Sequence, residues 1–381
     1  MNQNSIRYVG VNDHDIDLFE GQYAVKNGMA YNSYIIMDEK IAVMDTVDVR
    51  FTGEWLANLA RELDGRKPDY LIVQHMEPDH SASIASFMDA YPETVIVASQ
   101  KAFAMMSQFY GREYADRRIV AGEGTTLDLG GRTLSFITAP MVHWPEVLMT
   151  YDAQNGVLFS ADAFGKFGAL DTEEAWLEEA RRYYIGIVGK FGAQVQTVLK
   201  KAAALDIRAI CPLHGPALTE NPGYYLEKYQ TWSTYQPEEK GVTIACASIY
   251  GHTMEAAQLL ADELRARGVA VALYDLARCD MAQAVADAFR YDRLVLAASS
   301  YNGGVFPFMK TFIDHLTERG YQNRTVALME NGSWAPTAAR TMLKHLEAAK
   351  NLTMLSTVTI RSALNEQSEN AVKALAGELN V

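Results

Sequence analysis

The sequence predicts two domains of different class. Residues 1–238 have the texture of an α+β sandwich of sheets, and residues 242–381 that of an α/β doubly wound parallel sheet. Three observations support this division. A length of 381 residues suits about two domains. A polar stretch containing Pro237 and Gly241 interrupts the chain. After it, short apolar runs alternate with helical patterns, as in proteins with parallel sheets.

The C-terminal domain is predicted from five short apolar runs that alternate with amphipathic segments. The runs have the length and boundaries of buried strands, at residues 242–247, 269–273, 293–298, 325–330 and 354–360. Helical periodicity covers residues 255–267, 282–289, 308–319 and 335–349. Ligands of such sheets bind at the carboxyl ends of the strands. We therefore expect the loops that follow these strands to form a site.

The N-terminal domain mixes strands with surface helices. Residues 33–37 and 41–45 have the pattern of a hairpin, and residues 54–63 are helical. Further strands are predicted at residues 70–74, 133–138, 157–160 and 207–211, and acidic helical segments begin near residue 172. Strands and helices in this arrangement predict stacked sheets with helices outside, although propensity alone does not give the strand order.

Composition excludes several classes of protein. Three cysteines, all far apart, exclude a disulfide framework and an iron–sulfur or rubredoxin site carried by the chain itself. The net charge is −13, which argues against a nucleic-acid partner. Residues 1–240 carry 33 acidic and 21 basic residues, and the remainder carries 14 and 13. Apolar runs are too short to span a membrane. The N-terminus lacks the pattern of a signal peptide, so we expect a cytoplasmic protein.

A dense set of metal-ligand residues follows the predicted strand at residues 70–74. Four of them lie within six residues, and three more occur at or near later strand ends. The set is His75, Glu77, Asp79, His80, His143, Asp162 and His214. Seven nitrogen and oxygen ligands exceed what one metal needs, and they suit two. The absence of thiolates favours non-haem iron, manganese or zinc. Asp162 stands alone in its segment and is predicted to bridge the two metals.

Glu77 distinguishes this motif from its closest parallel. Hydrolases of the metallo-β-lactamase fold carry His-x-His-x-Asp-His at this place and are usually zinc enzymes. Here Glu77 replaces the second histidine. An anionic oxygen ligand stabilises higher oxidation states, so the substitution favours redox-active iron. Glu146, which lies close after His143, is interpreted as supporting the site and not as a ligand.

Three loops of the C-terminal domain predict an FMN site. The first follows the strand at residues 242–247 and offers hydroxyls and a glycine turn before a helix, without a Lys or Arg, which suits a monophosphate held by neutral donors as in flavodoxin. The other two offer backbone amides and aromatic rings for the flavin. The predicted FMN-binding residues are Ser248, Tyr250, Gly251, His252, Thr253, Met254, Ser299, Ser300, Tyr301, Asn302, Gly303, Gly304, Asn331, Gly332, Ser333 and Trp334.

With both sites in view, the chain resembles the flavodiiron proteins, also called A-type flavoproteins, over nearly its whole length. The resemblance implies a metallo-β-lactamase-like αββα sandwich followed by a flavodoxin-like domain. It implies His75, Glu77 and His143 on one iron, a bridging Asp162, and the remaining three ligands on the other iron. Members of the family reduce dioxygen to water, nitric oxide to nitrous oxide, or both. They pair head to tail, which implies a homodimer or a dimer of dimers.

The chain resembles the minimal class of the family. No rubredoxin or flavin reductase domain follows, so we expect a separate electron donor, most simply rubredoxin. Some members carry an additional histidine near the metal pocket, whereas residues 23–31 contain none, and the preference between the two gases stays open. Two other interpretations remain. One is a zinc hydrolase of the lactamase fold with a fused flavodoxin module, and the other is an electron-transfer protein that uses FMN alone.

Overall fold

The computed structural model describes residues 5–380 and divides into two compact units. The first comprises residues up to Tyr184 together with Ala193–Gln230, and the second comprises Ile185–Gly192 and the chain from Thr231 onward. Most of the N-terminal stretch in which a signal peptide would begin lies outside the described residues. Among the described residues, no helix has the length and apolar character that crossing a membrane requires.

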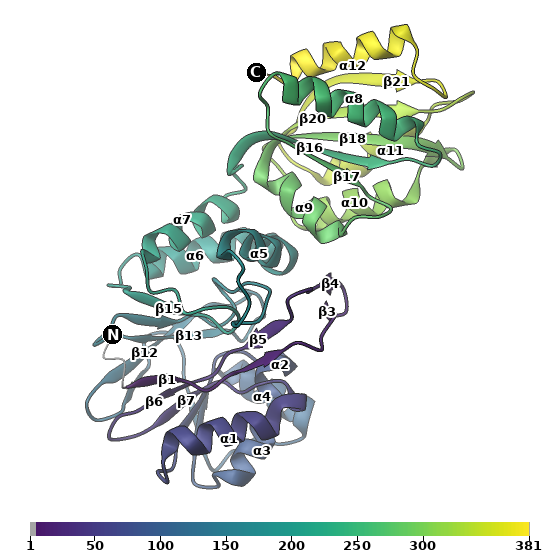
Figure 1. Ribbon diagram of the computed structural model, residues 1–381. Helices are drawn as coiled ribbons and strands as arrows, with labels where there is room; N and C mark the ends of the chain where they lie inside the picture. The colour runs from purple at the N-terminus through teal and green to yellow at the C-terminus, as the bar shows by residue number, and fades with distance from the viewer. Residues whose placement is uncertain (1–4, 381) are drawn as a thin grey trace. The chain divides into compact units, whose positions relative to one another are not determined.

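The first unit is an αββα sandwich, which confirms the predicted fold class (Figure 1). One sheet has the order β1-β6-β7-β8-β9-β10 and the other β11-β12-β13-β14-β15. Their bounds are β1 Ile6–Tyr8, β6 Tyr34–Ile36, β7 Ala42–Met44, β8 Tyr70–Val73, β9 Val95–Ala98, β10 Arg118–Val120, β11 Thr126–Asp128, β12 Thr133–Thr138, β13 Leu148–Asp152, β14 Val157–Phe159 and β15 Ala209–Cys211. The predicted hairpin at residues 33–45 is the antiparallel pair β6–β7.

Helices cover the outer faces of these two sheets (Figure 1). They are α1 Thr52–Leu63, α2 Pro78–Ser81, α3 Ile84–Ala90, α4 Gln100–Tyr110, α5 Trp176–Tyr183, α6 Gly192–Ala202 and α7 Pro222–Ser233. The inner faces pack against each other through buried side chains from both sheets, among them Ile72 and Val97 from one and Phe136 and Phe159 from the other. Burial of this apolar surface holds the layers together.

Two small hairpins lie beside the sandwich. β2 (Val11–Asp13) pairs with β5 (Met29–Tyr31), and β3 (Leu18–Phe19) pairs with β4 (Tyr23–Ala24). Between α5 and α6 the chain passes through a π-helical turn at Tyr184–Val188 and a 3₁₀ turn at Gly189–Phe191. The sequence patterns did not predict these short elements.

The second unit is a doubly wound parallel sheet, as predicted. The strand order is β17-β16-β18-β20-β21, and every pair along this path is parallel. The bounds are β16 Glu239–Ala247, β17 Val271–Asp275, β18 Tyr291–Tyr301, β19 Gly304–Val305, β20 Thr325–Asn331 and β21 Thr353–Ile360. The order reverses between β16 and β18, and such a switch point leaves a crevice at the carboxyl ends of the strands.

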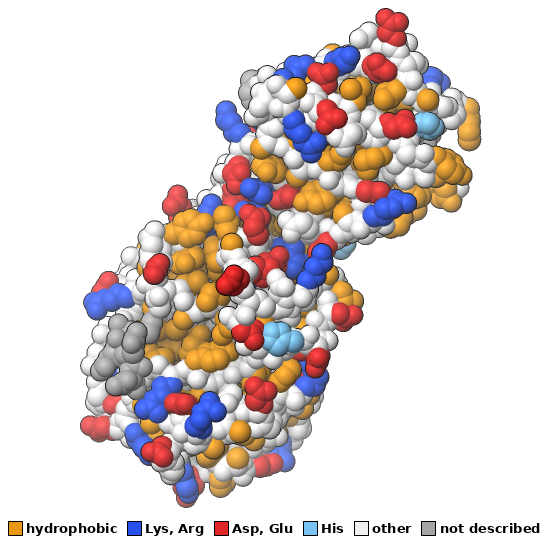
Figure 2. Space-filling model, in the orientation of Figure 1, with side chains coloured by type: hydrophobic (Ala, Val, Ile, Leu, Met, Phe, Trp, Pro, Cys, Tyr) orange, Lys and Arg blue, Asp and Glu red, His pale blue; other side chains and the backbone are white. Residues whose placement is uncertain are grey.

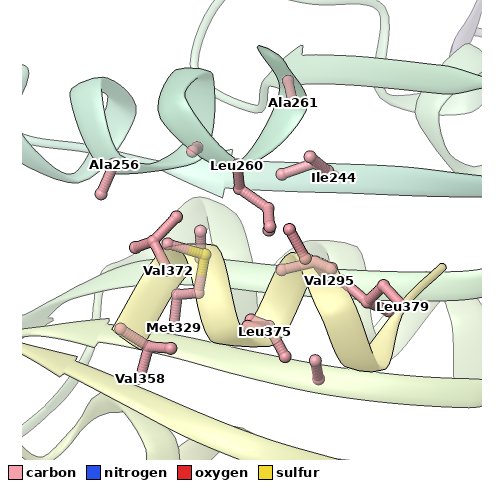
Figure 3. Close-up of a cluster of buried hydrophobic side chains, with 14 of the residues drawn as sticks. Ile244, Ala256, Leu260, Ala261, Val295, Met329, Val358, Val372, Leu375 and Leu379 are labelled. Carbon is pink, nitrogen blue, oxygen red and sulfur yellow. The ribbon is translucent and has the colours of Figure 1, made fainter. Parts of the chain in front are cut away.

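Helices pack on both faces of this sheet. Their bounds are α8 His252–Ala266, α9 Met281–Arg290, α10 Pro307–Glu318, α11 Ala338–His345 and α12 Glu366–Glu378. Figure 3 shows α8 and α12 closing one face, where Leu260 and Leu375 meet side chains of the central strands such as Val295. The interleaved strands and helices therefore bury a continuous core and leave the strand ends free for a ligand.

Candidate metal centre and flavin site

The metal-ligand residues of the first unit lie on loops that follow strands, and the fold brings them together. His75 and Glu77 come just after β8, and α2 carries Asp79 and His80. Pro78 occupies the first turn of α2, where its missing N–H and fixed φ are tolerated. His143, Asp162 and His214 come from loops after β12, β14 and β15 respectively.

Four of these side chains form a first group, comprising His75, Glu77, His143 and Asp162. Glu77 Oε2 lies 3.2 Å from His75 Nε2 and 3.1 Å from His143 Nε2. Asp162 Oδ2 lies 3.1 Å from His143 Nε2 and 3.5 Å from His75 Nε2. The imidazole nitrogens and carboxylate oxygens therefore converge on one point.

Asp79, His80 and His214 form a second group. His80 Nε2 lies 3.1 Å from His214 Nε2, and Asp79 Oδ2 lies 3.3 and 3.4 Å from these two nitrogens. Two ring nitrogens that face each other this closely share at most one proton, so the arrangement leaves a lone pair directed at the centre of the group.

Asp162 joins the two groups. While its Oδ2 belongs to the first group, its Oδ1 lies 3.2 Å from His80 Nε2 and 3.9 Å from His214 Nε2 of the second. The carboxylate thus offers one oxygen to each group, which is the geometry of a bridging ligand.

The residues fit a pair of metal ions. With metal–ligand bonds of about 2.1 Å, neighbouring ligand atoms lie about 3.0–3.4 Å apart in octahedral or tetrahedral coordination, and the observed separations match. In addition, both Asp79 oxygens and Asp162 Oδ1 are buried without a hydrogen-bond partner among the described residues. Uncompensated burial of carboxylate oxygens is costly, and metal ions would compensate it.

Neighbouring groups orient the histidines. His75 Nδ1 lies 2.8 Å from Glu146 Oε1, which also accepts the backbone N–H of Met76 at 2.9 Å. His214 Nδ1 donates to the Ala30 carbonyl at 2.7 Å. A proton on Nδ1 leaves the Nε2 lone pair free for a metal. The interpretation of Glu146 as a supporting residue agrees with this geometry.

Charge coupling within the groups is strong. Burial disfavours the charged imidazolium of His75, yet the Asp162, Glu146 and Glu77 carboxylates hold its pKa well above the usual value. For His143, burial is likewise outweighed by Asp162 and Glu77, and the pKa rises to about 9. Burial would raise the pKa of Asp162, but His75 and His80 hold it well below the usual value. The metal-free site therefore binds protons where it would otherwise bind cations.

The second unit contains a cavity of about 320 Å³ at the carboxyl ends of its strands. The lining residues come from the last residues of β18 and β20, the first turn of α8, and the loops after β16, β18, β20 and β21. They are Ser248, Ile249, Tyr250, His252, Thr253, Ser299, Ser300, Tyr301, Asn302, Gly303, Asn331, Gly332, Ser333, Trp334, Ala335, Thr337 and Ser362. Three predicted FMN-binding residues, Gly251, Met254 and Gly304, are not among them.

The chemistry of this cavity suits FMN. Tyr250 and Trp334 are 91% and 89% exposed, so two aromatic faces are available for stacking. Gly251 has φ +99°, a left-handed conformation that glycine adopts without strain, so the turn before α8 favours glycine. Thr253 Oγ1 lies 2.9 Å from Ser299 Oγ beside the N-terminus of α8, where hydroxyls, amides and the helix dipole favour an anion.

Sequence reasoning missed four lining residues, namely Ile249, Ala335, Thr337 and Ser362. Ser362 follows β21, so the rule that sites gather at strand ends would have found it. Met254 packs against the buried cluster under α8 instead of lining the cavity. The hydroxyl oxygen of Ser300 already accepts a backbone N–H, that of Thr337.

Comparisons with known proteins agree with both sites. The family model described as "ODP family beta lactamase" matches residues 29–215, and the flavodoxin model matches residues 244–373. A curated relative named nitric oxide reductase, from Moorella thermoacetica, is 31% identical over 355 residues, which are 91% of this chain and 88% of that protein. The chain belongs to the flavodiiron protein family. It is therefore an oxidoreductase, with FMN and a non-haem diiron centre as its cofactors.

Further relatives and solved structures are also similar to this flavodiiron chain. An anaerobic nitric oxide reductase flavorubredoxin from Vibrio vulnificus is 29% identical over 87% of this chain and 69% of that protein. The flavodiiron protein from Giardia intestinalis superposes with a TM-score of 0.91, at 25% identity, over 99% of this chain and 94% of that one. Rubredoxin oxygen:oxidoreductase from Desulfovibrio gigas has the same fold, with a TM-score of 0.91 at 24% identity over 100% and 97% of the two chains.

Proposed function

We propose that this flavodiiron protein reduces dioxygen to water, nitric oxide to nitrous oxide, or both. The Moorella relative is named a nitric oxide reductase and the Desulfovibrio neighbour an oxygen oxidoreductase, and both names support these substrates. The proposed metal ligands are His75, Glu77, Asp79, His80, His143, Asp162 and His214.

The observation that carries the proposal is the position of Asp162 between two ligand groups. A mononuclear hydrolase needs only one such group with an open position. Two groups that share a carboxylate would hold two metals close together, and such a pair would supply neighbouring open positions for a small gas.

The cofactors and the metal-binding residues have different roles at the site. When bound, the irons would supply open positions and two electrons, and FMN would supply two further electrons to them. Asp79, Glu77 and Asp162 provide negative charge that stabilises the oxidised metals. The side chains of His75 and His214 are completely buried, whereas those of Glu77 and Asp79 are 13% and 10% exposed. The two carboxylates therefore lie on the more solvent-accessible side of the site.

The balanced reactions give the number of electrons and protons that the metal site must receive. Reduction of one dioxygen to two waters consumes four electrons and four protons. Coupling of two nitric oxide molecules to nitrous oxide and one water consumes two of each. The proposal therefore includes an external electron donor of the rubredoxin type, as the names of the relatives suggest. We also propose that the protein is cytoplasmic and forms a head-to-tail homodimer. The boundary between its two domains is proposed to lie near residue 238.

Metal analysis combined with gas turnover tests the function. The anaerobically purified chain, reduced by a rubredoxin and its reductase, is supplied with dioxygen or nitric oxide separately. We expect about two irons and one FMN per chain, with consumption of at least one gas at the electron stoichiometry given above. Bound zinc with hydrolytic activity would support the fused-hydrolase interpretation instead. FMN without metal and without gas turnover would support a simple electron-transfer protein.

A further inference from the structure

One wall of the flavin cavity is a loop without regular structure. It runs from the end of β20 to the start of α11 and contributes Gly332, Ser333, Trp334, Ala335 and Thr337 to the lining. Because the loop leads directly into α11, the position of that helix terminus determines where the wall lies. Thr337, the residue before α11, does not cap the helix with its own side chain.

Ser300 supplies the missing cap from another strand. Its Oγ accepts the backbone N–H of Thr337 at 2.8 Å and that of Ala338 at 3.3 Å. A serine hydroxyl has two acceptor lone pairs, and both are engaged here. The same oxygen would lie only 3.0 Å from a β-carbon at Gly332, so the loop wraps closely around it.

Glu330 supplies a second cap. This buried carboxylate at the end of β20 accepts the backbone N–H of Ala339 through Oε2 at 2.9 Å. Its Oε1 accepts the hydroxyl of Thr359 at 2.9 Å, on the neighbouring strand β21. A carboxylate at a helix N-terminus is stabilised by the free amides and by the helix dipole.

Further bonds connect the same wall to the other loops of the cavity. Thr337 Oγ1 donates to the Gly304 carbonyl at 2.8 Å. Asn331 exchanges two bonds with Ser362, since its Nδ2 donates to the Ser362 carbonyl and its Oδ1 accepts the Ser362 N–H. Hydrogen bonds therefore connect the loops after β18, β20 and β21, and the caps of α11 belong to the same network.

We propose that Ser300 and Glu330 are positioning residues for the flavin. They cap α11 from neighbouring strands and so hold the wall that carries Trp334 in the geometry that binds FMN. The hydroxyl oxygen of Ser300 thus accepts backbone N–H groups, and because Ser300 also lines the cavity, its direct contact with the cofactor stays a prediction. The inference rests on the assignment of FMN to this cavity.

Loss of either cap should loosen the wall. Removing a helix cap or a hydrogen bond to a charged acceptor typically shifts the equilibrium between the capped and the uncapped conformation by about tenfold or more. In the FMN-free chain this loss lets the wall adopt other positions. FMN must then order the wall when it binds, which lowers its affinity.

FMN titration of variants tests the proposal. FMN is removed from the full chain, and its rebinding is followed by quenching of flavin fluorescence, with the iron content measured in parallel. The variants are Ser300→Ala, Glu330→Ala and the conservative Glu330→Gln, which keeps an acceptor for the Ala339 N–H. Asp280→Ala is the matched control, because Asp280 caps α9 through the Ala282 N–H and does not line the cavity.

We expect the FMN dissociation constant to rise about tenfold or more in Ser300→Ala and Glu330→Ala. In Glu330→Gln it should rise less than in Glu330→Ala, and in Asp280→Ala it should stay unchanged. Amide hydrogen exchange in the FMN-free chain should become faster at Thr337, Ala338 and Ala339 only in the first two variants. If Glu330→Ala does not fold, amide exchange at Thr337 and Ala338 in Ser300→Ala decides the matter, because Ser300 also lines the cavity.

Wild-type affinity in Ser300→Ala, or equal weakening in Asp280→Ala, would overturn the proposal, because the caps would then contribute only general stability. Unchanged exchange at the three amides would also overturn it. A wild-type chain that binds no FMN would instead contradict the cofactor assignment, so the two failures are distinguishable.

Discussion

Asp162 is the residue on which the metal centre depends most. Its two oxygens face different ligand groups, and its side chain is buried. Asp162→Ala should therefore remove the shared ligand, lower the iron content below that of the wild type and abolish gas reduction, while FMN stays bound in the other unit. Iron and flavin analysis of the purified variant checks this. Full activity with a wild-type iron content would show that the ligand assignment is wrong.

Glu146 gives a second test at the residue scale. The carboxylate holds His75 through Nδ1 and accepts the Met76 N–H without being placed as a ligand. Loss of such a supporting group typically lowers metal affinity about 10- to 100-fold. We expect Glu146→Ala to lose iron to a chelator more readily than the wild type, and Glu146→Gln to show an intermediate loss. Identical chelator resistance in all three proteins would contradict this role.

Protons and metals compete at this site. Because the pKa of His143 is raised to about 9 in the metal-free chain, and that of His75 is also raised, both imidazoles are protonated at neutral pH. A metal binds neutral imidazole, so binding must displace protons and must weaken as the pH falls below about 9. Titration of the metal-free chain with ferrous iron in weak buffer at neutral pH should release protons. A titration without proton release would refute the coupling.

At the scale of elements, helix α8 illustrates how the core supports the flavin unit. Leu260 is fully buried between α8 and the sheet (Figure 3). Leu260→Ala should destabilise this unit by about 2–5 kcal/mol through lost burial and an unfilled cavity. Gln258→Ala on the exposed side of the same helix should change stability by less than about 0.5 kcal/mol. Chemical denaturation of the two variants measures the difference, and equal stabilities would contradict the packing described.

The sequence predicted many strongly patterned elements, but the long helices α4, α7 and α12 were missed. All five main strands of the second unit and the helix α1 follow from apolar periodicity. The hairpin strands β2 to β5 have only two or three residues, too few for a period to be recognised. Helix α11 was predicted over residues 335–349 but spans Ala338–His345. Its first amides are capped by Ser300 and Glu330, which come from other elements, and local patterns carry no information about such caps.

For the site residues too, local sequence signals allowed prediction, whereas contacts made by tertiary packing did not. The spacing of His75, Glu77, Asp79 and His80 after a strand is a local signal, and it was sufficient to suggest a metal centre. The meeting of Asp162 with both ligand groups depends on the packing of two sheets, and only the structure shows its distances. The lining residue Thr337 lies well beyond the end of β20, where the strand-end rule no longer applies.

At the scale of the whole molecule, the chain combines a diiron unit and a flavin unit of different charge. Most of the net charge of −13 belongs to residues 1–240. On the face drawn in Figure 2, acidic and basic side chains are interspersed, without one continuous basic area. The difference in charge therefore follows the division of the chain into its two units.

The proposed diiron centre, in which the seven side chains would hold two irons with Asp162 between them, is the feature on which the proposed function depends. Mössbauer spectroscopy of the full chain loaded with iron-57, recorded in an applied magnetic field, examines it without reliance on turnover. We expect about two irons per chain whose spins are coupled in the oxidised protein, since a bridging ligand places the metals close together. Isolated ferric ions with independent magnetic splitting, or a single iron per chain, would contradict the bridged centre.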